Sequence, residues 1–329
     1  MSVRVLFQLV ITATLVGLII WYLGGIRDIT AIVATVDPIY VGLAFLVGTV
    51  DRALMVFKWG LLLRVRGAHL GFFRGMKIYC ASMIWGLFLP MTVGADAIRA
   101  IMTSRLGLQS DVVVASIVIE RVVGFLASLI SGLIGLYILT FRIELHENLQ
   151  AAWWVMGAAL LGGTAIFAGS FSNRLFDAVH GRLPPRVRAN RLVTRLRSLH
   201  ETYVGYSASG SVTWTFFGLT LLEQGTSIVF AWLIALGLHL KVSLLSMAGI
   251  IPVSMVVMRL PVSFNGIGVF EGAFIFLMSL AGVGAPEAVS IAVVGRVIEP
   301  LVWAPWWIRY TLEAKSLRPP KDALNRASV

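Results

Sequence analysis

Residues 82–100 read SMIWGLFLPMTVGADAIRA, and residues 254–272 read SMVVMRLPVSFNGIGVFEG. In both stretches an apolar run ends in Leu-Pro, a short polar patch follows, and a charged residue lies inside further apolar sequence. Because proline removes a backbone donor and the glycines beyond it allow a turn, each stretch predicts a helix, a break and a second helix. Broken helices at membrane depth line cavities or pack against protein, and a pair of them in two halves indicates a transporter's binding site.

The composition is that of a membrane protein. Of the 329 residues, 58% are hydrophobic and 13% are charged, and the mean hydropathy is +0.88, which leaves too little polar sequence to cover a soluble globule. The formal net charge of +11 lies in loops between apolar spans. This pattern indicates membrane orientation and anionic lipid headgroups, and no nucleic-acid partner is expected. Cys80 is the only cysteine, so a disulfide within the chain and a cysteine-based metal site are excluded.

Six apolar stretches are long enough to cross a bilayer. They lie near 5–25, 39–57, 112–141, 152–171, 213–238 and 288–310.

The two broken stretches, 76–108 and 243–283, lie between these spans. Lysine and arginine crowd the connection after the second span, which includes Lys58, and also the segment after 152–171 and the C-terminal tail. These three segments are therefore expected in the cytoplasm. The first broken stretch then begins and ends on the cytoplasmic side, which favours a re-entrant hairpin. The second begins and ends outside and has longer predicted limbs, so a hairpin and two tilted spans both remain open there.

We therefore predict an all-α polytopic membrane protein whose single membrane domain, 1–329, is an inverted repeat. Each repeat, 1–141 and 152–310, holds three transmembrane helices and one broken, re-entrant helical hairpin. The predicted location is the cytoplasmic membrane of a prokaryote, with both termini in the cytoplasm.

A basic connection, 172–212, joins the repeats, and a cytoplasmic tail, 311–329, follows the second one. Apolar residues in the connection recur at helical spacing, which predicts an amphipathic helix on the cytoplasmic headgroups. They are Leu192, Leu196, Leu199 and Tyr203. For the first half of the connection, a solvated linker remains the alternative.

Charged residues inside the predicted membrane segments are candidates for a functional site, because each costs about 2.5 kcal/mol or more at the bilayer centre unless it is paired or wetted. Either they form structural ion pairs between the two halves, or they line a polar, water-accessible cavity. They are Asp51, Arg52, Asp96, Arg99, Glu120, Arg121, Glu223, Arg259, Glu271, Arg296 and Glu299.

The predicted site combines these charges with the two breaks, at Pro90 and Pro261. The second limb of each hairpin begins at the break with free backbone N–H groups, where an anion can bind. The predicted substrate-binding residues are Thr92, Gly94, Asp96, Arg99, Glu120, Arg121, Ser263, Asn265, Gly266, Gly268, Glu271, Arg296 and Glu299.

The arginines of this set suit a phosphate, and the carboxylates balance charge, bind a cationic headgroup moiety or take up a proton. The glycines lie where the backbone bends or approaches the substrate. A side chain at Gly266 is therefore expected to block the site without preventing insertion.

Several enzyme classes find no support in the sequence. It contains no GxxxxGK[ST] motif, so the protein is not expected to hydrolyse ATP itself. The five histidines are scattered and none is paired at metal-ligand spacing, so no metal and no cofactor is expected.

Three motifs resemble those of the flippase-like integral-membrane domain found in lysylphosphatidylglycerol synthases and in many stand-alone bacterial and archaeal proteins. They are LFLPMTVGADAIRA at 87–100, IVIERVVGF at 117–125 and LPVSFNGIGVFEGAF at 260–274. The resemblance covers nearly the whole chain and implies movement of a lipid or lipid-linked headgroup between leaflets. Ala95 stands where the family usually has glycine, and Phe270 where it often has arginine before the glutamate. The synthase domain is absent, so aminoacylation is not expected.

We expect a lipid flippase for an anionic phospholipid or a polyprenyl-phosphate-linked glycolipid. Two alternatives stay open at this point. One is an integral-membrane lipid- or glycan-modifying enzyme that uses Asp96, Glu120 and Glu271 as acid and base groups, and the other is a non-catalytic partner of a separate lipid-synthesising enzyme. Membrane lipids are the expected partners, and a homo-oligomer is a further expectation.

Overall fold

A computed structural model describes residue 14 and residues 34–86, 93–142, 150–182, 184, 190–206, 210–260, 263 and 266–313. Within these residues there is no β-strand. The helices are α3 (Pro38–Val65), α4 (Phe72–Gly86), α5 (Val93–Ser104), α6 (Ser110–Tyr137), the π-helix η1 (Ile138–Arg142), α7 (Gln150–Ser170), α8 (Asn173–Gly181), α10 (Arg191–Val204), α11 (Gly210–Gly237), α12 (Leu244–Met258), α13 (Val269–Leu280) and α14 (Ala285–Glu313).

Five of the described helices are long and apolar enough to cross a membrane: α3, α6 with its continuation into η1, α7, α11 and α14. They coincide with five of the six predicted spans, which are therefore confirmed as helices. The remaining predicted span, 5–25, lies outside the described residues except for residue 14. The chain is an all-α polytopic membrane protein.

The same order of helix lengths occurs twice. The first series, α3 to α6, has lengths of 28, 15, 12 and 28 residues, and the second series, α11 to α14, has lengths of 28, 15, 12 and 29 residues. The two short helices of each series are about 22 and 18 Å long at 1.5 Å per residue, so neither crosses a core of about 30 Å.

The expectation of longer limbs in the second broken stretch is therefore wrong. Ser243 caps the start of α12 by accepting a hydrogen bond from Ser246 N, and α13 begins only after Gly268, whose φ is +83°. The turns at both ends shorten the helices to the lengths seen in the first series.

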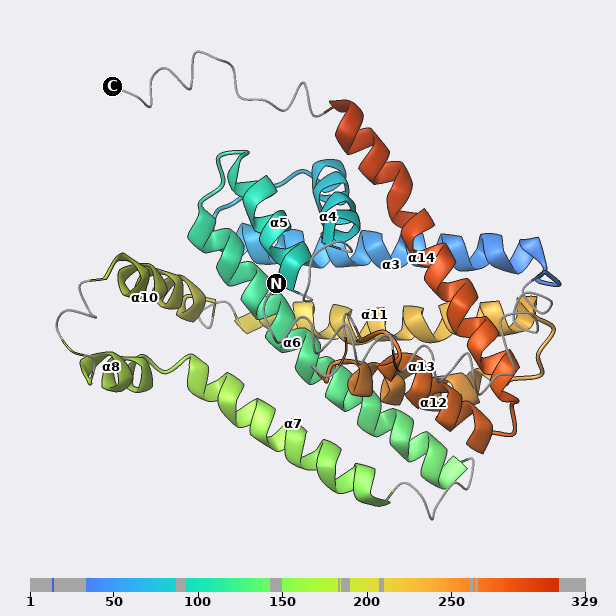
Figure 1. Cartoon of the computed structure of the whole chain (residues 1–329). Coiled ribbons are helices and arrows are strands. Elements are labelled where there is room, and N and C mark those ends of the chain that lie inside the picture. The colour runs from blue at the N-terminus through green and yellow to red at the C-terminus, as the bar shows by residue number, and fades with distance from the viewer. Residues whose placement is uncertain are drawn as a thin grey trace.

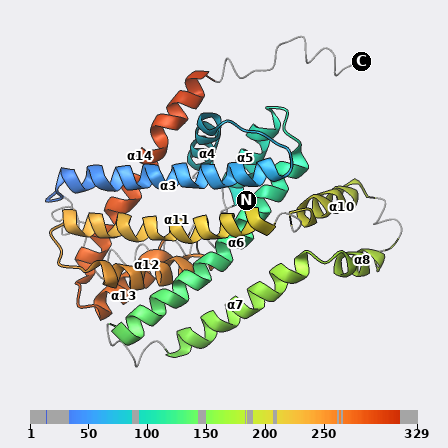
Figure 2. The same cartoon turned by 180° about the vertical axis from the view of Figure 1, so that it is seen from behind.

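The long helices α3 and α11 lie side by side and run in opposite directions (Figures 1 and 2). The start of α3 meets the end of α11, where Asp37 N donates to Gly237 O at 2.8 Å. Asp37 also caps α3 through its side chain, which accepts from Ile39 N at 2.8 Å. Opposite directions of corresponding helices are what an inverted repeat requires. The inverted relation of the two halves as wholes stays a prediction.

The broken stretches pack across the boundary between the two series. Helix α6 of the first series packs on α12 of the second, and α14 of the second packs on α4 of the first. An ion pair between Lys77 and Glu313 joins α4 to α14. Each series therefore completes the packing of the other one, and one apolar core runs through both.

The position of Lys58 differs from the expectation based on the sequence. Lys58 was expected in a cytoplasmic connection, but α3 continues through it and its side chain is 2% exposed. Helix α11 supplies its partners, because the Lys58 ammonium pairs with Glu223 and donates to Thr220 Oγ1 at 3.1 Å. The apolar residues that follow, Trp59 to Leu63, keep the helix within the core.

The described residues of the basic connection include two short helices, α8 (Asn173–Gly181) and α10 (Arg191–Val204), and α10 packs against α6. Ser198 Oγ donates to Asp111 Oδ2 at 2.5 Å, and the ring of Tyr203 stacks on Phe171 with centroids 4.7 Å apart. Part of the predicted apolar face therefore contacts protein, whereas Leu196 is exposed. Contact of α10 with lipid headgroups remains a prediction.

The close packing of α6 against α12 gives a testable prediction about stability. A Cβ added at Gly135 lies 2.6 Å from the backbone oxygen of Gly249, so Gly135→Ala is expected to push the two helices apart and lower the melting temperature of the purified protein. Gly124 on the same helix has no atom within 4 Å of such a Cβ. Gly124→Ala is the matched control and should leave the melting temperature unchanged or raise it slightly, because alanine favours helix by about 1 kcal/mol over glycine.

Candidate functional site

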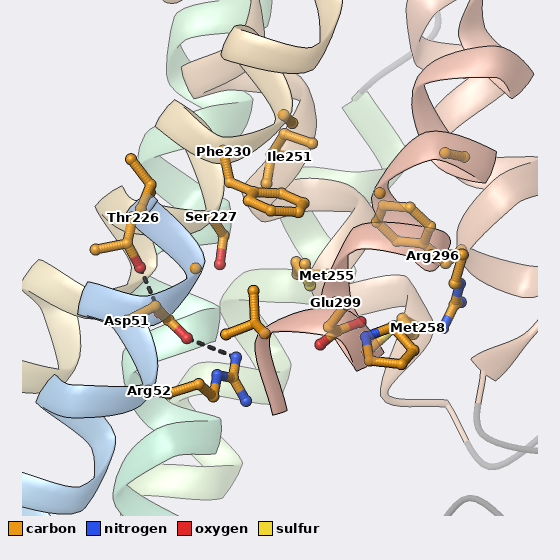
Figure 3. Close-up of a pocket in the computed structure, with 18 of the residues that line it drawn as sticks. Asp51, Arg52, Thr226, Ser227, Phe230, Ile251, Met255, Met258, Arg296 and Glu299 are labelled. Carbon is orange, nitrogen blue, oxygen red and sulfur yellow. Dashed lines mark hydrogen bonds and ion pairs between the residues drawn. The ribbon is translucent and has the colours of Figure 1, made fainter. Parts of the chain in front are cut away.

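A cavity of about 380 Å³ lies between the two helix series, with walls from α3 to α6 and from α11 to α14 (Figure 3). Most of its lining is apolar. The polar and charged lining residues are Asp51, Arg52, Arg121, Thr226, Ser227, Arg296 and Glu299. The charged residues of this list therefore agree with the alternative in which intramembrane charges line a cavity.

Two ion pairs occupy equivalent places in the two series. In the first, Arg121 Nε donates to Asp96 Oδ2 at 2.6 Å, and in the second, Arg296 Nε donates to Glu271 Oε1 at 3.0 Å. The partners are 25 residues apart in both pairs. Each acid lies in the first turn of the second short helix, and each arginine lies on the following long helix, eleven residues after its first residue. Only the arginines reach the cavity wall.

Each of these carboxylates has a second donor. Asp96 accepts from Arg99 Nη2 at 3.3 Å, and Glu271 accepts from the backbone N of Gly268 at 2.6 Å, which closes a capping box at the start of α13. Because the carboxylates keep these partners, Arg121 and Arg296 can turn towards a ligand without leaving an unpaired buried charge.

Arg99 and Glu120 form a buried pair away from the cavity. Arg99 is 2% exposed, and its guanidinium carbon lies 4.8 Å from the ring centre of Trp59 and 4.6 Å from that of Tyr79. Its Nη2 lies 2.9 Å from Glu120 Oε2, and Tyr79 Oη donates to Glu120 Oε1 at 3.0 Å. The prediction that Arg99 and Glu120 contact substrate does not match this geometry, because rings and an ion pair enclose them. We therefore expect them to have a structural role.

Asp51 and Arg52 line the cavity, although they are not among the predicted substrate-binding residues. Asp51 accepts a hydrogen bond from Thr226 on α11 and lies 2.5 Å from Arg52 Nη2, whose guanidinium is 5.9 Å from the ring centre of Trp303. In the sequence, the signal for these two residues is an acid next to a base in the middle of a predicted span. This signal does not show towards which side of the helix their side chains point.

Glu299 lies one turn after Arg296 on α14 and lines the cavity. Its binding to substrate stays a prediction. Within the described residues its carboxylate has no hydrogen bond or ion pair. Figure 3 shows it between Arg52 and Arg296. It therefore adds a negative charge to a wall that carries three arginines.

The predicted residues at the breaks lie outside the cavity or outside the described residues. Pro90, Thr92, Pro261 and Asn265 belong to the undescribed part of the chain. The remaining ones, Gly94, Ser263, Gly266 and Gly268, are described but are not part of the cavity lining.

The expectation for Gly266 changes accordingly. Its φ is +70°, and an added Cβ meets Met258 Cγ and lies 3.1 Å from Met258 O. A side chain at Gly266 therefore strains the turn after α12 and pushes against Met258, which lines the cavity. Loss of folded protein is the expected effect of Gly266→Val, in addition to a change in the cavity wall.

The two departures from the family motifs lie in the cavity wall, because both Ala95 and Phe270 line it. The ring centre of Phe270 is 5.9 Å from the guanidinium carbon of Arg296, and a Cβ added at Gly86 lies 2.6 Å from Ala95 Cβ. These residues therefore set the shape of the cavity beside its arginines.

Comparison with known proteins agrees with this picture. The family described as the lysylphosphatidylglycerol synthase TM region matches residues 5–304. A UPF0104 membrane protein from Methanothermobacter thermautotrophicus is 23% identical over 308 residues, which cover 85% of this chain and 84% of that protein. Since the family match spans both helix series and the cavity between them, the chain belongs to the lysylphosphatidylglycerol synthase transmembrane-region family.

Proposed function

We propose that the protein moves a lipid with a phosphate headgroup between the leaflets of the membrane, through the cavity between its two helix series. The candidates are an anionic phospholipid and a polyprenyl-phosphate-linked glycolipid. The observation that supports the proposal best is the pair of arginines, Arg121 and Arg296, at equivalent positions in one mostly apolar cavity.

Guanidinium groups bind phosphate through two parallel hydrogen bonds, and a charge at membrane depth is costly unless it serves a ligand, a partner or water. The side chains of Arg121 and Arg296 are 45% and 38% exposed, so both have room for a ligand beside their carboxylate partners. A cavity shared by two similar halves is also the arrangement in which alternating access exposes one site to each side in turn.

We expect the lipid to cross the membrane without chemical change. Since the sequence lacks an ATP-binding motif, the protein either equilibrates its substrate or couples to an ion gradient. We place it in the cytoplasmic membrane of a prokaryote, with both termini in the cytoplasm. A separate lipid-synthesising enzyme that supplies the substrate is the proposed protein partner, and a second copy of the chain is another.

The test uses purified protein in liposomes that contain a trace of fluorescent phosphatidylglycerol. A membrane-impermeant quencher removes the signal of the outer leaflet alone in protein-free liposomes. With protein, we expect inner-leaflet probe to move to the outer leaflet, where the quencher removes its signal as well, while mass spectrometry finds the lipid unchanged. A new lipid species instead supports the enzyme alternative. If the protein moves neither phosphatidylglycerol nor a polyprenyl phosphate, the proposed function is contradicted.

The inverted topology gives a prediction of its own. Arg105 follows α5 and Lys241 follows α11, and both are exposed. In a Cys80→Ala background, a cysteine at Arg105 is expected to react with an impermeant maleimide from the cytoplasmic side, and a cysteine at Lys241 from outside. Native Cys80 is buried, so the wild-type chain should not react from either side and serves as a control. Labelling of both introduced cysteines from one side contradicts the inverted repeat.

A further inference from the structure

The cavity is symmetric at its centre. Corresponding positions of the two series are defined by the equal lengths of α3 and α11 and of α4 and α12, and by the equivalent ion pairs beyond them. By this correspondence Met83 matches Met255 and Arg121 matches Arg296, and all four residues line the cavity. The centre of the cavity is therefore built by the same positions of both series.

Beyond this centre the linings contributed by the two series differ. The second series lines the cavity with Ala231, Ile251, Phe274 and Gly295, one from each of its four helices, whereas the corresponding residues of the first series are not part of the lining. We call the space beside these four residues the apolar extension. None of the four carries a charge or a polar side chain.

The corresponding positions of the first series hold the buried ion-pair cluster. Ala231 matches Trp59, Ile251 matches Tyr79, Phe274 matches Arg99 and Gly295 matches Glu120. In the first series two large rings and an Arg–Glu pair fill the space, with Arg99 between the rings. In the second series, smaller or uncharged residues stand at these places. The sequence difference between the two halves therefore accounts for the apolar extension.

We propose that the apolar extension binds a hydrocarbon chain of the lipid whose phosphate lies at Arg121 and Arg296. This inference rests on the proposed function and adds where the hydrocarbon chain of the lipid lies in the cavity. Apolar cavities in proteins stay dry and take up apolar guests, and the adjoining arginines supply the charge that the other end of such a lipid needs.

The size of the cavity limits what enters it. About 380 Å³ lies near the lower end of the range of roughly 300–1,000 Å³ for small-ligand pockets. It therefore accommodates the headgroup phosphate and the adjoining part of one chain, while the rest of the lipid stays in the bilayer. A soluble phosphate ester lacks the part that the extension binds, so we expect it to compete poorly.

Photo-crosslinking tests the inference with the wild-type chain. Phosphatidylglycerol with a diazirine in its acyl chain is incorporated with the protein in liposomes, and labelled peptides are identified by mass spectrometry. We expect cross-links at Ile251 or Phe274, and competition by dodecyl phosphate but not by glycerol phosphate. Cross-links confined to outward-facing residues such as Leu222 and Phe276, which are exposed, would overturn the inference.

A substitution that fills the extension provides the second measurement. A Cβ at Gly295 lies 3.4 Å from Phe230 Cε1 and 3.6 Å from Ile234 Cδ1, which is ordinary contact. Gly295→Leu therefore places its remaining atoms in the cavity, and we expect at least tenfold fewer cross-links and at least tenfold slower lipid movement. Gly162→Leu on α7 is the matched control, because nothing lies within 4 Å of a Cβ there. It should change neither the number of cross-links nor the rate of lipid movement.

The two proposals fail in different ways. If the wild-type protein moves lipid while cross-links avoid the extension, or if a folded Gly295→Leu variant transports at the wild-type rate, the chain-binding inference is wrong and the proposed function stands. If the chain cross-links in the extension but no lipid moves, the chain-binding inference stands and the proposed function is wrong. Should Gly295→Leu not fold, the wild-type cross-links decide alone.

Discussion

Glu120→Ala is expected to lower stability more than any other single substitution considered for this protein. Removing this carboxylate leaves Arg99, which is 2% exposed, with Asp96 at 3.3 Å as its one remaining acidic partner within the described residues, and Asp96 is shared with Arg121. The hydroxyl of Tyr79 also loses its carboxylate acceptor and is left with the sulfur of Met55 at 3.6 Å. Breaking one partner of a buried ion pair costs about 3–5 kcal/mol. The melting temperature and the monodisperse yield of the purified protein measure the loss.

Two control variants separate the buried charge from a loss of packing. Arg99→Met with Glu120→Leu removes both charges and keeps apolar volume, and it should recover much of the stability, because well-packed hydrophobic residues often replace a buried pair at little cost. Glu201→Ala removes the partner of the exposed Arg197 and should change the melting temperature little. If Glu120→Ala melts like the wild type, the structural role of the pair is refuted.

The double variant Arg121→Ala with Arg296→Ala is expected to reduce lipid movement by at least tenfold while the protein stays folded. The loss of function follows from removing both guanidinium groups from the cavity wall. The fold should survive, because Asp96 keeps Arg99 and Glu271 keeps the backbone N–H of Gly268. Partly exposed ion pairs contribute only about 0–1 kcal/mol each. Initial rates in the liposome assay and the melting temperature together test this prediction.

Lysine substitutions sharpen this experiment. Arg121→Lys and Arg296→Lys keep the charge but lose the two-pronged geometry, so each is expected to transport more slowly than the wild type and faster than the matching alanine variant. Arg197→Ala, which removes an exposed arginine of α10, should transport normally. A stable double-alanine variant with the wild-type rate would exclude both arginines from the site.

Much of the fold follows from local sequence. Apolar length predicts the spans, and proline with glycine predicts the two breaks, because these features act on the residues that carry them. The position of Asp96 and Glu271 just after the breaks and of Arg121 and Arg296 in the next spans also appears in the sequence as a repeated motif. Ion pairing of intramembrane charges was one of the two alternatives that the sequence left open.

The partners of several charges could not be predicted, because they depend on how distant helices pack. Lys58 looked like a loop residue until α11 was seen to supply Glu223, which is 165 residues away along the chain. Arg99 looked like a ligand for phosphate, although it is enclosed by Trp59 and Tyr79. The apolar residues of the cavity wall give no signal at all, since a lining residue and a core residue have the same side chains.

The capping box at Gly268 has a consequence for how fast the protein can work. The carboxylate of Glu271 holds Arg296 in the resting state and keeps its backbone partner when the arginine leaves, and Asp96 acts in the same way towards Arg121. In the proposed lipid movement, an arriving phosphate would therefore compete with a carboxylate that stays in place, so each arginine would give up only part of its attraction to the substrate. A carrier limited by release gains from such competition, because weak holding in the middle of the path shortens the residence time of each lipid.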